Sequence, residues 1–156
     1  MADQFRDFVQ VLEAFWKQEV DYILIGGVAV IFYGLQRLTR DIDIFIKMDI
    51  KNIEQLRKAL YMVYEDSSIE EITINELKNY PVIRYGTPNG FSIDIISRLG
   101  EVATYEELEY EVIDCQGVKI RIATPETLFK LKKDTVRHKD RGDAIFLKEL
   151  IEERKR

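Results

Sequence analysis

The sequence is poor in the residues that bind soft metals or form disulfides. It has one cysteine, Cys115, and one histidine, His138, among 156 residues. A single cysteine excludes a disulfide within the chain and any zinc site built from cysteines. Hard cations held by carboxylate oxygens stay compatible with this composition. We interpret Cys115, which lies beside an expected hairpin turn, as a structural residue, and His138 as non-catalytic.

The chain also lacks a long apolar run. Its most apolar stretch, residues 22–35, is shorter than the roughly 20 residues that a membrane-spanning helix needs. The first residues include acidic side chains and lack the apolar core of a signal peptide. We therefore expect no membrane segment and predict a cytoplasmic location.

Linkers, internal repeats and low-complexity segments are missing as well. At about 100–200 residues per domain, we expect residues 1–156 to form a single domain. Hydrophobic residues make up 46% of the chain, which argues against intrinsic disorder. The net charge of −5 argues against a dedicated duplex-binding protein. However, residues 130–141 contain six basic side chains, and this local patch suits a ligand that carries phosphate.

Hydrophobic periodicity predicts an α/β (α+β) fold with a mixed β-sheet and flanking helices. Asp49 and Thr124 are expected N-caps, the latter followed by a proline at the first helical position. Residues 65–80 are polar, with at most a short helix. The expected helices cover residues 3–19, 28–34, 50–64, 125–136 and 139–153, and the expected strands cover 22–25, 41–46, 82–85, 91–96, 111–114 and 118–122.

Three features of these elements are candidates for chemistry. Gly26-Gly27 follows a strand, where a glycine backbone can approach a phosphate closely. Asp41 and Asp43 share one face of a strand, about 7 Å apart, a spacing that suits a divalent cation. Asp94 lies within an apolar strand, where a charge is unfavourable unless it is paired or bound to a metal.

Each feature also has a plain structural explanation. A Gly-Gly pair after a strand is often only a turn, and an Asp-x-Asp pair is often exposed. Asp94 could instead form a salt bridge with Arg37, Arg40 or Arg84. Taken one at a time, these features do not indicate a function.

Their order and spacing are more informative. An apolar strand, Gly26-Gly27, thirteen residues, Asp41-x-Asp43 and a later strand aspartate resemble the nucleotidyltransferase superfamily with the DNA polymerase β fold. Residues 123–132 and 137–143 are similar to the last two helices of its small bacterial and archaeal members. These include nucleotidyltransferases of toxin–antitoxin and abortive-infection systems. Ile44 stands where many active members carry another acidic residue, and the chain is too short for the separate substrate-binding domain of larger relatives.

The resemblance implies metal-dependent transfer of a nucleoside monophosphate from an NTP to a hydroxyl of an RNA such as tRNA, a protein or a small molecule. It implies two Mg²⁺ or Mn²⁺ ions bound by the catalytic residues Asp41, Asp43 and Asp94. It also implies that Gly26 and Gly27 face the phosphates, and that an antitoxin-like protein is a partner. The alternative is a non-catalytic nucleotide-binding or regulatory module of a toxin–antitoxin pair.

Several basic and acidic side chains near the C-terminus have open roles. Candidates for neutralising nucleotide phosphates are Lys130, Lys132, Lys133 and Lys139, with a solvated surface patch as the alternative. Asp140 and Asp143 share a helical face and are expected to form ion pairs with Arg or Lys. Near the glycines, Phe32 and Tyr33 are expected to pack in the core.

Overall fold

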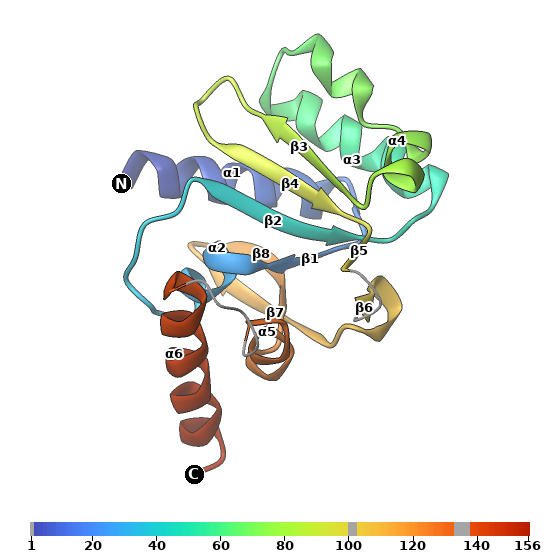
Figure 1. Cartoon of the computed structure of the whole chain (residues 1–156). Coiled ribbons are helices and arrows are strands. Elements are labelled where there is room, and N and C mark those ends of the chain that lie inside the picture. Colours follow the sequence, from blue (N-terminus) through green and yellow to red (C-terminus); the bar gives the residue numbers. More distant parts are fainter. Residues whose placement is uncertain (1, 100–102, 133–137) are drawn as a thin grey trace.

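The structure, a computed structural model, describes residues 2–99, 103–132 and 138–156, and it describes side chains for 4–99, 104–132 and 141–156. Its centre is a six-stranded sheet in the order β3-β4-β2-β1-β8-β7 (Figure 1). The strands are β1 (Tyr22–Ile25), β2 (Asp41–Ile46), β3 (Val82–Gly86), β4 (Ser92–Ile96), β7 (Tyr110–Cys115) and β8 (Val118–Ala123). Two short strands, β5 (Arg98–Leu99) and β6 (Ala103–Thr104), form a separate pair.

The sheet is mixed, as the sequence predicts. β2 pairs with β4 and β1 with β8 in parallel, whereas β1–β2, β3–β4 and β7–β8 are antiparallel. The helices are α1 (Ala2–Lys17), α2 (Gly26–Phe32), α3 (Ile50–Val63), α4 (Ile74–Asn79), α5 (Pro125–Lys132) and α6 (His138–Arg154), with short 3₁₀ turns η1 (Ser67–Glu71) and η2 (Tyr105–Glu107). Figure 1 shows α1 behind the sheet and α6 projecting away from it toward the C-terminus. The parallel β2–β4 pair places the ends of two central strands side by side.

The alternation of side chains along β2 divides core from site. Ile42, Ile44 and Ile46 are fully buried, and they anchor the strand in the hydrophobic core. Asp41 and Asp43 occupy the alternate positions and are only partly buried. The strand is therefore fixed by one face while the other presents carboxylates.

The predicted helix starts at Asp49 and Thr124 are confirmed. The Asp49 carboxylate accepts a hydrogen bond from the backbone N–H of Lys51 at 3.3 Å. The Thr124 hydroxyl accepts one from Thr127 at 3.2 Å, and α5 begins at Pro125. These side chains satisfy N–H groups that lack partners within the helix.

Other boundaries differ from the expectation. α2 begins at Gly26 rather than at residue 28, so both glycines belong to its first turn. A Cβ at either glycine would overlap a neighbouring side chain. The polar segment 65–80 forms both η1 and α4, whose caps Asp66 and Thr73 each accept a backbone N–H. The helix expected over 125–136 is described to Lys132, and residues 133–136 lie outside the described ranges. In the described ranges, no helix has the length and apolarity to cross a membrane.

Candidate active site

The three predicted aspartates lie on adjacent strands and line the same pocket. Asp43 on β2 stands directly opposite Asp94 on β4 in the parallel register, and Asp41 lies two residues before Asp43. The pocket has a volume of about 250 Å³. Its lining residues are Gly27, Arg37, Thr39, Asp41, Asp43, Val82, Arg84, Asp94, Ile96 and Lys132. We call it the acid pocket.

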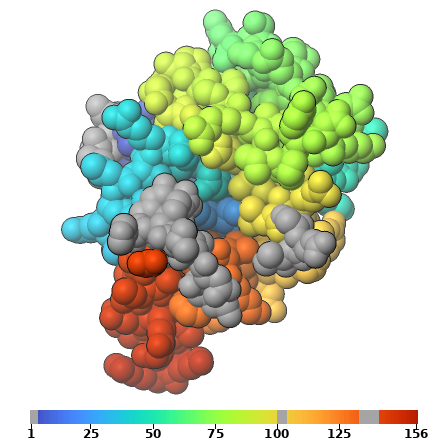
Figure 2. Space-filling view, viewed as in Figure 1, coloured from blue at the N-terminus to red at the C-terminus, as the bar shows by residue number. Residues whose placement is uncertain are grey.

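The glycine pair lies against this pocket. Gly26 has a φ of +75°, and a Cβ added there would overlap Asp43 Oδ2. A Cβ added at Gly27 would overlap the Arg37 guanidinium. The space-filling view shows blue atoms, in the colour of the β1–α2 region, recessed between yellow and orange segments (Figure 2). Because neither glycine has a side chain, the Asp43 carboxylate and the Arg37 guanidinium can approach the start of α2 closely.

Arg84 on the edge strand β3 occupies the acidic side of the pocket. It is the cross-strand neighbour of Asp94, and its Nε and Nη2 donate to Asp94 Oδ1 and Oδ2 at 2.9 and 3.2 Å. Its Nη2 also lies 3.8 Å from Asp41 Oδ2. The salt bridge that the sequence left open for Asp94 thus forms with Arg84.

The opposite side of the pocket holds two cations fixed by one buried acid. Asp143 on α6 is fully buried. Its Oδ2 accepts hydrogen bonds from Lys132 Nζ at 2.8 Å and Arg37 Nη2 at 2.9 Å, and its Oδ1 lies 2.9 Å from Arg37 Nε. The ion pairing predicted for Asp143 is confirmed. Arg37 and Lys132 both line the pocket, so this triad of two cations and one acid brings net positive charge to it.

The protonation of Asp43 reflects its position between like charges. Burial, which is the largest cause, the charge of Asp94, a hydrogen bond with Asp94 and the charge of Asp41 together raise the pKa of Asp43 from 3.8 to about 7. The charge of Lys132 acts in the opposite direction. Asp43 therefore holds a proton more tightly than an ordinary aspartate, because it is largely buried beside two other carboxylates.

The donor set suits a hard divalent cation, since it consists of carboxylate oxygens that repel one another. Within the described part of the chain, however, no group of three or more His, Cys, Asp or Glu side chains is arranged as it would be around a bound metal ion. The three carboxylates face one pocket but do not converge on a common point as expected, and Arg84 donates to both oxygens of Asp94. The residues fit a metal by their chemistry and their placement in one pocket.

Of the other predicted lysines, the structure describes the side chain of Lys130 alone. Lys130 is exposed and lines a different pocket with Glu107, Glu109 and Glu126, so it does not reach the acid pocket. Lys133 and the side chains of His138, Lys139 and Asp140 lie outside the described residues.

The two aromatic residues expected in the core do pack against it. The Phe32 ring lies 5.2 Å from that of Phe5, and the Tyr33 hydroxyl donates to the carbonyl of Ala123 at 2.8 Å. Cys115 is partly buried and also packs against the core. These contacts support structural roles for all three residues.

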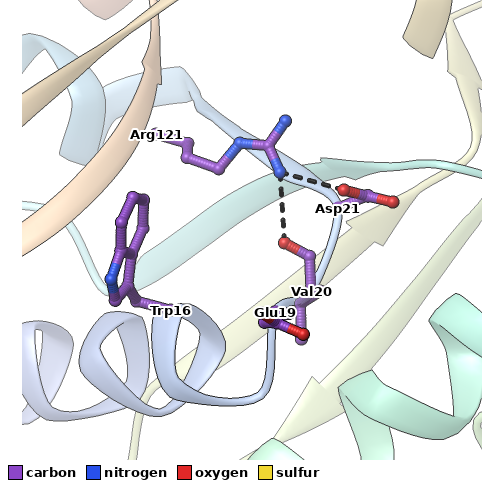
Figure 3. A pocket seen from close by; sticks show the side chains of 5 residues that line it. All are labelled: Trp16, Glu19, Val20, Asp21 and Arg121. Carbon is purple, nitrogen blue, oxygen red and sulfur yellow. Dashed lines mark hydrogen bonds and ion pairs between the residues drawn. The ribbon is translucent and has the colours of Figure 1, made fainter.

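A slightly larger pocket, of about 290 Å³, lies at the opposite end of β1 (Figure 3). It is lined by Trp16, Glu19, Val20, Asp21 and Arg121. Arg121 donates to Asp21 at 3.1 Å and to the carbonyl of Val20 at 3.4 Å, so its charge is used within the fold. We assign the functional site to the acid pocket, because, of these two pockets, it is the one that combines several strand carboxylates with the cations Arg37 and Lys132.

Sequence reasoning names Arg37 and Arg84 only as candidate partners of Asp94, and it missed both as pocket residues and Asp143 as the partner of Arg37. Arg37 lies 106 positions from its partner Asp143, and no local pattern connects the two. Arg84 could have been found from the hairpin, because an antiparallel register that pairs residue 84 with residue 94 places the two side chains on one face.

The mixed sheet, with paired aspartates beside a glycine turn, agrees with the nucleotidyltransferase fold that the resemblance implies. The family model described as "Nucleotidyl transferase AbiEii toxin, Type IV TA system" matches residues 10–143. The chain therefore belongs to the AbiEii nucleotidyltransferase toxin family. Membership supports nucleotidyl transfer as the general activity, and it implies a nucleotide substrate and an antitoxin partner.

Solved structures support the fold. An antigenic nucleotidyltransferase-like protein from Paracoccidioides brasiliensis is 18% identical, with a TM-score of 0.62, over 95% of this chain and 77% of that one. The lincosamide antibiotic adenylyltransferase LnuA, bound to lincomycin, is 16% identical, with a TM-score of 0.58, over 92% of this chain and 95% of that one. At these identities the likeness concerns the fold. No curated protein matches the sequence.

Proposed function

We propose that the acid pocket catalyses metal-dependent transfer of a nucleoside monophosphate from an NTP to an acceptor hydroxyl. The observation that carries this proposal is the register of β2 and β4. It sets Asp43 opposite Asp94 at the pocket, while Asp143 holds two cations on the other side. Three carboxylates and the cations Arg37 and Lys132 thus line one small cavity, which suits a triphosphate and its attacking hydroxyl.

In the proposed reaction, the acceptor hydroxyl oxygen forms a bond to the α-phosphorus of the NTP, and the bond to pyrophosphate breaks. Asp94 accepts the hydroxyl proton, for which it must first release Arg84. Arg37 and Lys132 stabilise the charge that develops on the departing pyrophosphate. Gly26 and Gly27 leave room for phosphate oxygens beside the first turn of α2.

Asp41, Asp43 and Asp94 would hold the divalent cations, Mg²⁺ or Mn²⁺, in this proposal. When bound, such ions polarise the phosphate and make the acceptor hydroxyl easier to deprotonate. The pKa of Asp43, raised to about 7 without a metal, supports this assignment because a cation would relieve the repulsion among the three carboxylates.

The proposed acceptor is a hydroxyl of an RNA such as tRNA or of a protein. The second candidate function is a nucleotide-binding regulatory module without catalysis. Arg84 favours this alternative because its guanidinium binds the carboxylate of Asp94. Ile44 also favours it, because many active relatives have an acidic residue at this position.

Thermal shift and pyrophosphate release, measured together, distinguish the two functions. The protein is incubated with Mg²⁺, each NTP in turn and total cell extract as the acceptor source. An enzyme should melt at a higher temperature with its NTP and release pyrophosphate only when extract is added. A regulatory module should show the thermal shift without pyrophosphate release, which would refute catalysis.

A further inference from the structure

Arg84 places a positive charge in the acid pocket beside Asp94 and Asp41. It comes from β3, the edge strand of the sheet, and 62% of its side chain is exposed. Its partner Asp94 is only 14% exposed. The arginine therefore covers a largely buried carboxylate while remaining accessible itself.

The contact uses both oxygens of Asp94. Nε and Nη2 of Arg84 donate to Oδ1 and Oδ2 at 2.9 and 3.2 Å, the parallel geometry that makes arginine–carboxylate pairs specific. Nη2 is also 3.8 Å from Asp41 Oδ2, so one guanidinium faces two of the three aspartates. A divalent cation bound by these carboxylates would need the positions that the guanidinium fills.

The pairing is also reversible in physical terms. Ion pairs with an exposed partner contribute little to stability, because water and salt compensate the charges when the pair opens. Backbone pairing of β3 with β4 fixes the Arg84 backbone opposite Asp94, but the side chain has an open path to solvent. Arg84 can thus leave Asp94 without unfolding the strand.

We propose that Arg84 is an internal counter-cation that competes with the divalent cation for Asp94 and Asp41 and so sets the concentration at which the acid pocket binds metal. This inference rests on the proposed function, because it takes the three aspartates as the metal ligands. It also explains why these carboxylates face one pocket without surrounding a common point.

The test is a titration with Mn²⁺ in which electron paramagnetic resonance measures the free ion. The variants are Arg84→Gln, which removes the charge, and Arg84→Lys, which keeps it but loses the two-point contact. Arg156→Gln is the control, because it makes the same change in net charge at an exposed C-terminal position. Circular dichroism melting establishes that each variant folds.

We expect Arg84→Gln to bind Mn²⁺ about tenfold more tightly than the parent, since one competing charge is removed. The Mn²⁺ affinity of Arg84→Lys should lie between those of the parent and Arg84→Gln, and the affinity of Arg156→Gln should equal that of the parent. If the parent binds Mn²⁺ and folded Arg84→Gln binds it no more tightly than the parent, the competing role of Arg84 is overturned, whereas the proposed metal site is not. If neither protein binds Mn²⁺ at millimolar concentration, the metal site of the proposed function fails and this inference fails with it.

Discussion

Lys132 Nζ, at the end of α5, donates a hydrogen bond to Asp143 Oδ2 on α6 at 2.8 Å, and both side chains are almost completely buried. The same carboxylate binds Arg37 from the loop that precedes β2. One acid in the C-terminal helix thus fixes two cations that face the aspartates of the central strands. The C-terminal helix is therefore part of the candidate site.

Asp143→Asn should weaken both the fold and the pocket. Removing one partner of a buried ion pair leaves the other charge uncompensated and costs about 3–5 kcal/mol in the free energy of unfolding. Urea denaturation followed by circular dichroism measures this loss. Asp49→Asn is the matched control, because asparagine caps a helix as well as aspartate does. An unchanged unfolding free energy for Asp143→Asn would show that the triad contributes nothing to stability.

The stability of the metal-free protein should fall as the pH rises through neutrality. The pKa of Asp43 is raised from 3.8 to about 7 by burial and by Asp94, so the folded state holds this proton more tightly than the unfolded chain. This contribution is fully present below pH 4 and is lost as the pH passes 7, at about 1.4 kcal/mol per pH unit.

The measurement is urea denaturation in EDTA between pH 5 and 8, for the parent and for Asp43→Asn. The parent should lose about 3 kcal/mol more than the variant between pH 5 and 8, because nearly all of this loss falls below the folded pKa of about 7. Parallel pH profiles would mean that Asp43 titrates near its ordinary pKa in the folded protein.

Asp43→Asn should also separate metal binding from stability. Without metal, the variant should melt at or above the parent temperature, because a neutral amide relieves the repulsion with Asp94 and Asp41. In millimolar Mn²⁺, the parent should gain stability through binding of the ion to the native state, and the variant should lose most of this gain. A variant that melts lower in EDTA yet keeps the full Mn²⁺ response would show that Asp43 is a structural residue.

The two glycines should tolerate no side chain. Gly26→Ala places a Cβ on Asp43 Oδ2 at a positive φ, and Gly27→Ala places one on the Arg37 guanidinium. We expect Gly26→Ala to lower the free energy of unfolding by at least about 1 kcal/mol, and both variants to bind NTP more weakly. Gly142→Ala in α6 is the control, because its Cβ would meet open space and alanine favours helix. Unchanged NTP affinity for Gly27→Ala would argue against phosphates lying beside this turn.

Local patterns were sufficient to predict the acidic half of the site. Alternation along β2 places Asp41 and Asp43 on one face, and the apolar strand around Asp94 indicates that this charge has a partner. The glycine pair marks the turn into α2. Each of these features depends on residues close together in the sequence, so the period of the strand and the chemistry of glycine determine them.

The basic half could not be predicted in this way. Lys130 and Lys132 are two residues apart on α5, so they point in different directions, and only Lys132 lines the acid pocket. Which lysine faces inward depends on how α5 packs against α6, and the position of Arg37 depends on Asp143, 106 residues away. Such pairings are fixed by tertiary packing, which one sequence does not reveal.

The most direct test of the central claim is transfer of label from an α-³²P-labelled NTP. The purified protein is incubated with each NTP, Mg²⁺ or Mn²⁺ and either total tRNA or cell extract, and labelled RNA and protein are separated by electrophoresis. The proposed function predicts that the parent and Asp49→Asn label an acceptor with at least one NTP, whereas folded Asp43→Asn and Asp94→Asn lose this activity by at least about a hundredfold. Equal labelling by the parent and folded Asp43→Asn would contradict the assignment of nucleotidyl transfer to the acid pocket.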